Sequence, residues 1–101
     1  MEIIFRNDNL KDLYINAFTS KFAKQYSQGI IKNYVKCITL LGSLPNSNEI
    51  KKFKGLSFEK LNKYKDGDYS IRINNQYRII FNILKDNNIE IIEITDLTDY
   101  H

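Results

Sequence analysis

The sequence of 101 residues contains one cysteine, one proline and one histidine, and it has no long hydrophobic run. The single cysteine, Cys37, excludes a disulfide within the chain, and we expect a buried thiol because it lies in a helical apolar stripe. One histidine without a cluster of cysteines argues against a zinc site, so we expect no metal and no cofactor. No stretch approaches the roughly 20 apolar residues of a membrane span, and we expect no membrane contact.

The N-terminal segment MEIIFRNDN also lacks the basic region and apolar run of a secretory signal peptide, so a cytoplasmic protein is expected. Repeats and low-complexity linkers are absent, and 43% of the residues are hydrophobic. That content is enough for one core, and we predict a single domain over residues 1–101. The net charge of +3 permits a nucleic acid or an acidic protein as partner without requiring either.

Two amphipathic helices are predicted in the first half of the chain. The first follows a candidate strand at residues 2–5, and its apolar residues recur with helical spacing from Leu10 to Phe18. The second covers residues 27–41, with Gly42 as a C-cap. Each helix has an apolar stripe on one face, as expected for a helix that packs on a sheet.

The second half of the chain has the alternating pattern of β-strands. Segments at residues 69–73, 76–84 and 88–95 are rich in β-branched and aromatic residues, and asparagine-rich turns separate them. The same pattern leaves undecided whether residues 58–61 form a further strand. The order β-α-α-β-β-β predicts an α+β fold in which two helices pack on one face of a small antiparallel sheet.

The first hairpin has a predicted register that places two arginines opposite each other. A three-residue turn pairs Ile73 with Tyr77 and collects the apolar side chains on one face, whereas a two-residue turn would mix the faces. In this register Arg72 faces Arg78 across the two strands, and like charges in such a pair are destabilising. The pair therefore binds an anion such as a phosphate, unless both side chains splay into solvent or one of them pairs with Glu93.

The segment FEKLNKYKDGDY, upstream of this hairpin, carries Lys60, Lys63 and Lys65 around Tyr64. Basic residues interleaved with an aromatic residue can hold a nucleic-acid backbone and stack a base. Two aspartates in the same segment weaken this signal, and a solvated lysine-rich turn is the alternative interpretation.

The last three residues, Asp99, Tyr100 and His101, combine a carboxylate, a phenol and an imidazole. A four-residue turn after the second strand of the hairpin would place Arg78 beside Thr95, so that the tail emerges over the basic face. Such a set suits RNA cleavage by the 2′-hydroxyl, which needs a base, an acid and cations around the phosphate. A frayed end or the remnant of a tag is the alternative.

The segments FEKL, GDYSIRINNQYRIIF and IEIIEITDLTDYH resemble the HigB-type toxins of the RelE/ParE superfamily, over residues 55–101. The resemblance implies a compact α+β fold like that of microbial RNases. It also implies a type II toxin that cleaves mRNA in the ribosomal A site without a metal, leaving a 2′,3′-cyclic phosphate. The implied partners are the ribosome with its mRNA and a HigA-like antitoxin with a helix-turn-helix domain, through which alone the toxin reaches operator DNA.

The resemblance also assigns roles to individual residues. The implied catalytic residues are Arg78, Asp99, Tyr100, His101 and Lys63, and the implied RNA-binding residues are Arg72, Lys60 and Lys65. His101 or Asp99 takes the 2′ proton, and Tyr100 stacks a base or protonates the leaving oxygen. Lys60 or Lys65 can take the role of Lys63, because the lysine in this sequence stands one position away from the basic residue of the family's pattern. A gyrase-inhibiting toxin of the ParE type and a non-catalytic partner-binding domain are the alternatives.

Overall fold

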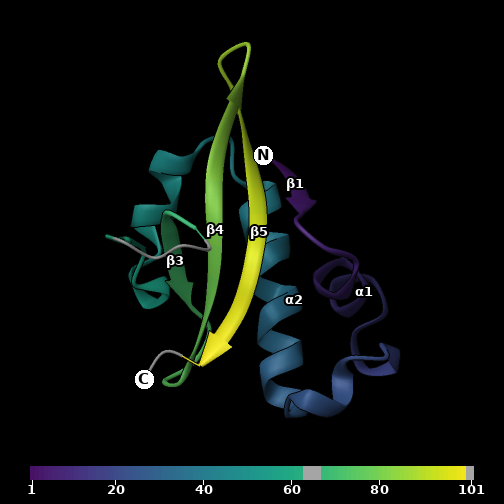
Figure 1. Cartoon of the computed structure of the whole chain (residues 1–101). Coiled ribbons are helices and arrows are strands. Elements are labelled where there is room, and N and C mark those ends of the chain that lie inside the picture. The colour runs from purple at the N-terminus through teal and green to yellow at the C-terminus, as the bar shows by residue number, and fades with distance from the viewer. Residues whose placement is uncertain (63–66, 100–101) are drawn as a thin grey trace.

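The computed structural model describes residues 1–62 and 67–99, in which two α-helices lie against a five-stranded sheet (Figure 1). In chain order the strands and α-helices are β1 (Glu2–Phe5), α1 (Asp8–Asn16), α2 (Gln28–Ser43), β2 (Glu59–Lys60), β3 (Tyr69–Arg72), β4 (Tyr77–Asp86) and β5 (Ile89–Asp99). Short 3-10 helices connect them, namely η1 (Ala17–Thr19), η2 (Ala23–Gln25), η3 (Ser47–Lys52) and η4 (Lys54–Leu56). The predicted α+β class and its element order are confirmed, and β2 is the additional strand.

The strands follow the order β1-β5-β4-β3-β2 across the sheet. β1 runs parallel to β5, whereas the other neighbouring strands pair antiparallel, so the sheet is mixed rather than antiparallel throughout. Ile3 and Phe5 pack against the core while the alternate residues of β1 are exposed. Alternation in a four-residue strand shows which face is buried but not which distant strand it joins.

α1 begins after Asn7, whose Oδ1 accepts a hydrogen bond from the Leu10 N–H at 3.0 Å. The helix ends before Ala17, which has a φ of 48°. Phe18 is consequently outside the helix and 54% exposed. The predicted extension of the apolar stripe to Phe18 is wrong, because the backbone leaves the helix while the spacing of apolar residues continues.

α2 is capped at its start by Ser27, whose Oγ accepts a hydrogen bond from the Ile30 N–H. Cys37 lies on its buried face, as predicted. Gly42 is inside the helix, so the predicted C-cap is wrong. The Gly42 carbonyl instead accepts a hydrogen bond from the Met1 amino group at 3.0 Å, and this tertiary contact satisfies a carbonyl that a capping residue would otherwise serve.

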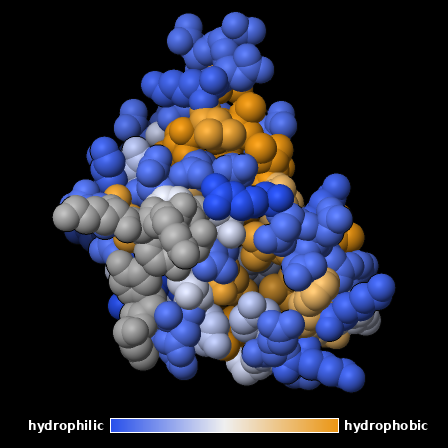
Figure 2. Space-filling view, viewed as in Figure 1, coloured by the Kyte–Doolittle hydropathy of each residue, from blue (hydrophilic) through white to orange (hydrophobic). Residues whose placement is uncertain are grey.

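The core lies between the two α-helices and one face of the sheet, and α2 passes behind β5 in Figure 1. The sheet contributes fully buried side chains to it, among them Ile71, Ile79 and Phe81. On the side seen in Figure 2, hydrophobic residues gather over the upper part of the β4–β5 hairpin. In the part of the chain that the structure describes, no helix is long and apolar enough to cross a membrane.

Candidate functional site

β3 and β4 pair in the register that the sequence predicts. The Ile73 N–H donates to the Tyr77 carbonyl across the turn at 3.1 Å, and Arg72 stands opposite Arg78. Asn74 closes the turn, because its Oδ1 accepts hydrogen bonds from two backbone N–H groups that follow it. The predicted opposition of the two arginines is therefore confirmed.

Arg78 is held in place by several contacts and is only 8% exposed. Its Nε donates to the Ser70 Oγ at 2.8 Å, and its Nη2 donates to the Ser57 carbonyl at 2.5 Å. The same Nη2 lies 3.8 Å from a carboxylate oxygen of Glu59. A guanidinium fixed by partners on two sides keeps a defined direction, which is a requirement for a cation that positions a reacting group.

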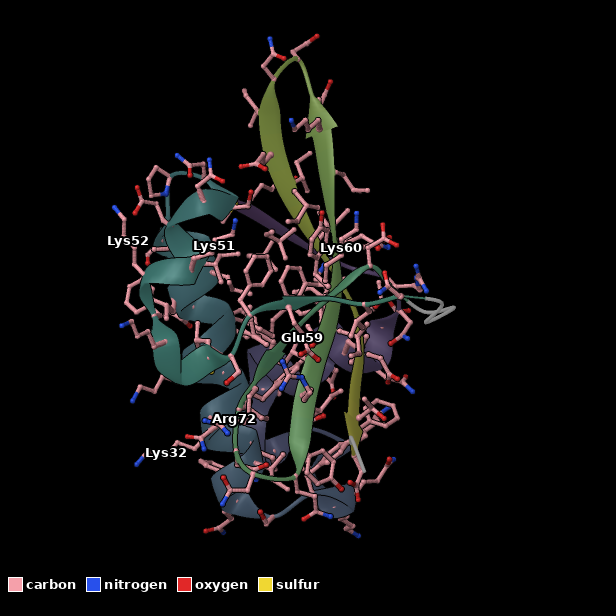
Figure 3. All side chains as sticks on the ribbon, turned by 90° about the vertical axis from the view of Figure 1, so that its left-hand side faces the viewer. Lys32, Lys51, Lys52, Glu59, Lys60 and Arg72 are labelled. Carbon is pink, nitrogen blue, oxygen red and sulfur yellow. The ribbon has the colours of Figure 1, made fainter. Side chains whose placement is uncertain are left out.

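The expected repulsion between the arginines is avoided because the two side chains take different surroundings. Arg78 is buried against Ser57, Ser70 and Glu59, whereas Arg72 is exposed. Figure 3 shows Arg72 and Glu59 on the same side of the molecule. Glu93, the alternative partner for an arginine of this hairpin, pairs with Arg6 at 3.6 Å.

Glu59 is a site residue that reasoning from the sequence missed. It pairs with Ser70 in the β2–β3 register, and Ser70 is the residue that accepts the hydrogen bond from Arg78. Alternation in FEKL puts Glu59 on the face opposite Phe58 and Lys60, but it does not show that this segment pairs with β3. By the same rule Lys60, which pairs with Tyr69, lies on the other face from Glu59 and is not brought to Arg78.

The turn between β4 and β5 differs from the prediction. Asp86 pairs with Ile89, so only Asn87 and Asn88 form the turn. Both have a left-handed backbone, with φ of 50° and 67°, as a two-residue hairpin turn requires. The predicted four-residue turn is therefore wrong, since asparagine adopts this conformation more readily than most residues.

A bulge in β5 changes the register again before the strand reaches Arg78. Thr95 is the extra residue, and its hydroxyl donates to the Ile80 carbonyl at 3.1 Å. Beyond the bulge, Arg78 pairs with Thr98, one residue before β5 ends at Asp99. The predicted neighbour Thr95 and the predicted strand end at residue 95 are both wrong. The strand continues past the bulge, where the buried alternation shifts from Ile92 and Ile94 to Leu97.

Asp99 pairs with Tyr77 next to the Arg78–Thr98 pair. Its Oδ2 accepts a hydrogen bond from the Gln76 Nε2 at 2.7 Å. Since consecutive strand residues point to opposite faces, the Asp99 carboxylate leaves β5 on the side of Tyr77 rather than on that of Arg78. The predicted site residues Lys63, Lys65, Tyr100 and His101 lie outside the described residues.

The described part of the site thus combines a rigid buried cation with an accessible carboxylate. The Glu59 side chain is 46% exposed, while that of Arg78 is 10% exposed, so solvent reaches the carboxylate more easily than the guanidinium. A fixed guanidinium can bind a phosphate oxygen, and a carboxylate beside it can exchange a proton. The arrangement is therefore suited to binding and transforming a phosphodiester.

Comparisons with known proteins identify the family of the chain. Residues 3–101 match the family model of the RelE-like toxin of type II toxin-antitoxin system HigB. A solved YoeB/ParE toxin from Agrobacterium tumefaciens is similar over 100% of both chains, with a TM-score of 0.59 and 12% identity, which shows a shared fold. No curated protein matches the chain. The match to the family model extends over nearly the whole chain, and the protein belongs to the HigB family of RelE-like toxins of type II toxin–antitoxin systems.

Proposed function

We propose that this toxin is an endoribonuclease that cuts translated mRNA in the ribosomal A site, without a metal ion. The observation that carries the proposal is the fixed, buried guanidinium of Arg78 with the Glu59 carboxylate 3.8 Å away. Membership of the HigB family supports the same function. The proposed reaction is attack by a ribose 2′-hydroxyl on the adjacent phosphorus.

In this reaction the 2′-oxygen forms a bond to phosphorus while the bond to the 5′-oxygen of the next nucleotide breaks. The products are a 2′,3′-cyclic phosphate and a free 5′-hydroxyl, so one group must accept the 2′ proton and another must supply a proton to the leaving oxygen. Arg78 binds a non-bridging phosphate oxygen and stabilises the charge that develops there. Its hydrogen bonds to Ser57 and Ser70 hold it in position before the RNA arrives.

The proton transfers are assigned to the C-terminal residues and to Glu59. His101 or Asp99 takes the 2′ proton, and of the two His101 is preferred, because the Asp99 carboxylate leaves β5 on the side of Tyr77 and is bonded to Gln76. Tyr100 stacks a base or protonates the leaving oxygen. Glu59 is a further candidate for the base, because its exposed carboxylate adjoins the arginine. Lys63 is the second catalytic cation, and Lys65 and Arg72 bind the RNA. Lys60, the other lysine that the resemblance implies, lies on the opposite face of β2 from Glu59 and is not brought to the phosphate beside Arg78.

The ribosome is the proposed partner in catalysis, because it holds the mRNA in line for attack and the toxin alone does not. Free RNA is therefore cut slowly or not at all. The second proposed partner is a HigA-like antitoxin with a helix-turn-helix domain, which neutralises the toxin and links it to operator DNA. All of these partners place the protein in the cytoplasm.

The test is expression in a bacterial host, with primer extension on translated mRNAs. We expect codon-phased cuts with the wild type and with Arg6→Ala, a control that removes an exposed arginine paired with Glu93 rather than with Glu59. The cuts should disappear in Arg78→Ala and His101→Gln, with circular dichroism confirming that each variant folds. Full cleavage by Arg78→Ala would refute the proposed site, and toxicity with DNA damage but intact mRNA would indicate gyrase inhibition instead.

A further inference from the structure

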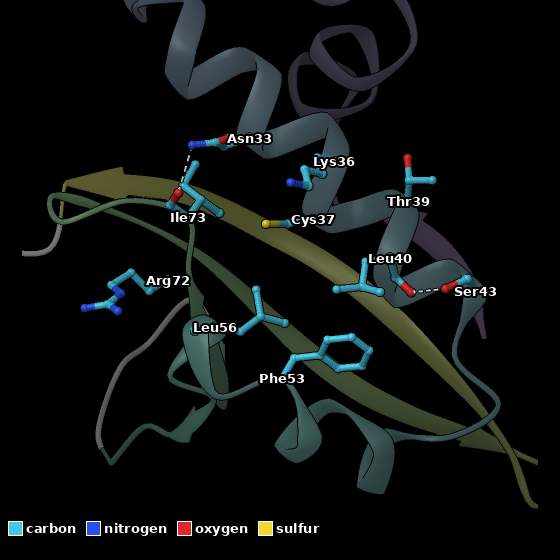
Figure 4. Close-up of a pocket in the computed structure, with 11 residues that line it drawn as sticks. Asn33, Lys36, Cys37, Thr39, Leu40, Ser43, Phe53, Leu56, Arg72 and Ile73 are labelled. Atoms are coloured by element: carbon cyan, nitrogen blue, oxygen red, sulfur yellow. Dashed lines mark hydrogen bonds between the residues drawn. The ribbon is translucent and has the colours of Figure 1, made fainter.

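A groove of about 600 Å³ lies between α2, the η3–η4 segment and the end of β3 (Figure 4). Apolar residues from all three elements line it, namely Cys37, Leu40, Phe53, Leu56 and Ile73. The proposed RNA site uses none of these side chains. The groove therefore adjoins the proposed RNA site and shares only Arg72 with it, and its lining suggests an apolar ligand.

Phe53 exposes apolar surface to water in the groove. Its side chain is 41% exposed, although most large apolar residues of the chain are buried. Leu56 beside it is half-buried and packs against the core, so the floor of the groove continues into the hydrophobic interior. Exposed apolar surface of this kind, bordered by polar residues, typically marks a protein-binding site.

The rim of the groove is positively charged. Lys36 and Arg72 line it, and none of the described residues around it is acidic. Figure 3 shows Lys32, Lys51 and Lys52 on the same side of the molecule. The nearest acidic residues of η3 and β2 are already paired, since Glu49 contacts Lys52 at 2.6 Å and Glu59 contacts Arg78. The uncompensated charge favours an acidic partner.

We propose that this groove is the docking site of the cognate antitoxin. A segment of the antitoxin places apolar side chains against Phe53 and Leu56 and carboxylates beside Lys36 and Arg72. The apolar floor favours a protein segment over RNA, which binds mainly through charged and stacking contacts. The inference depends on membership of a toxin–antitoxin family and not on RNA cleavage.

The experiment measures binding of the purified toxin to the antitoxin encoded beside its gene, by isothermal titration calorimetry. Lys36→Glu and Phe53→Glu should each raise Kd by about tenfold or more, as expected at the centre of an interface. Lys11→Glu and Ile15→Glu are the matched controls, because both residues are exposed on α1, outside the groove. The controls should bind like the wild type.

Unchanged affinity of both groove variants, or weakening by the α1 controls alone, would overturn the proposal. Toxicity without antitoxin is the second readout, and both groove variants should remain as toxic as the wild type. Reduced toxicity with normal antitoxin affinity would show that the groove serves RNA or the ribosome, and would also overturn it. Lys36→Glu changes only an exposed side chain, so its affinity for the antitoxin tests the proposal even when Phe53→Glu fails to fold. Because calorimetry needs no RNA cleavage, a toxin without nuclease activity leaves this test valid.

Discussion

Gly67→Ala tests how closely the backbone packs against the sheet just before β3. Gly67 is buried, and a Cβ at this position would lie 2.7 Å from the Ile80 Cγ2 and 2.9 Å from the Thr95 Oγ1. It would also lie 3.2 Å from the Phe81 carbonyl oxygen. Nonbonded carbon atoms are most stable at roughly 3.5–4.0 Å. Ile80 is fully buried and the Thr95 hydroxyl is hydrogen-bonded, so neither neighbour can retreat without disturbing the sheet.

Gly55→Ala is the matched control, because no heavy atom lies within 4 Å of the Cβ it would add. Neither glycine has a positive φ, so neither alanine is strained by its backbone. Both alanines restrict the unfolded chain, which contributes about 0.4–1 kcal/mol to stability in each variant. This contribution cancels when the two variants are compared, and the remaining difference is the cost of overpacking, about 1–3 kcal/mol.

Thermal unfolding followed by circular dichroism measures this difference. A domain of this size loses about 4–8 °C in Tm for each kcal/mol. We therefore expect Gly67→Ala to melt about 4–24 °C below Gly55→Ala. Equal melting temperatures for the two variants would refute the close packing of Gly67 against Ile80 and Thr95.

Three further predictions concern single contacts. Arg78→Lys loses the fork of hydrogen bonds that anchors the guanidinium, so it should lower stability by about 1–3 kcal/mol in urea unfolding and should also abolish growth arrest on expression; unchanged growth arrest would argue against its catalytic role. Tyr34→Phe removes a buried hydroxyl that donates to the Leu10 carbonyl at 2.8 Å, and it should lower the free energy of unfolding by about 1–2 kcal/mol in the same assay. Hydrogen bonds from the Ser47 hydroxyl and N–H lower the pKa of Glu90, so its contribution to stability is present at neutral pH and is lost as the pH falls through that lowered pKa. Glu90→Gln should therefore be less stable than the wild type at neutral pH, with a difference that shrinks in acid; a constant difference across the pH range would contradict this.

The hairpin that carries Arg78 was predictable in detail, whereas the next hairpin was not. Alternation from Tyr69 to Phe81 allows only one register that collects the apolar side chains on a single face, and the structure has that register. The β4–β5 pair follows the same alternation, but a two-residue turn and the bulge at Thr95 change which residues meet. The position of Thr98 beside Arg78 depends on both irregularities. The bulge shows in the sequence only as a shift of the apolar alternation between Ile94 and Leu97, which by itself does not distinguish a bulge from the end of the strand.

The candidate site shows the same division. The arginine was recognisable from its motif, but its partners were not, because Ser57 lies 21 residues upstream and has a left-handed backbone with φ of 45°. A pattern in the sequence does not indicate that this carbonyl will face a guanidinium on another strand. Glu59 was missed for a similar reason, since its role depends on the pairing of a two-residue strand with Ser70.

Local order along the chain therefore determined the α+β class, the two helices and the opposition of Arg72 and Arg78, because periodicity and one buried face leave few alternatives. Only the tertiary structure decided that Arg78 is buried while Arg72 is exposed, and that the groove beside Phe53 is apolar within and basic at its rim. These features arise where segments distant in sequence meet, and the free energy of such contacts depends on distances that no local pattern contains.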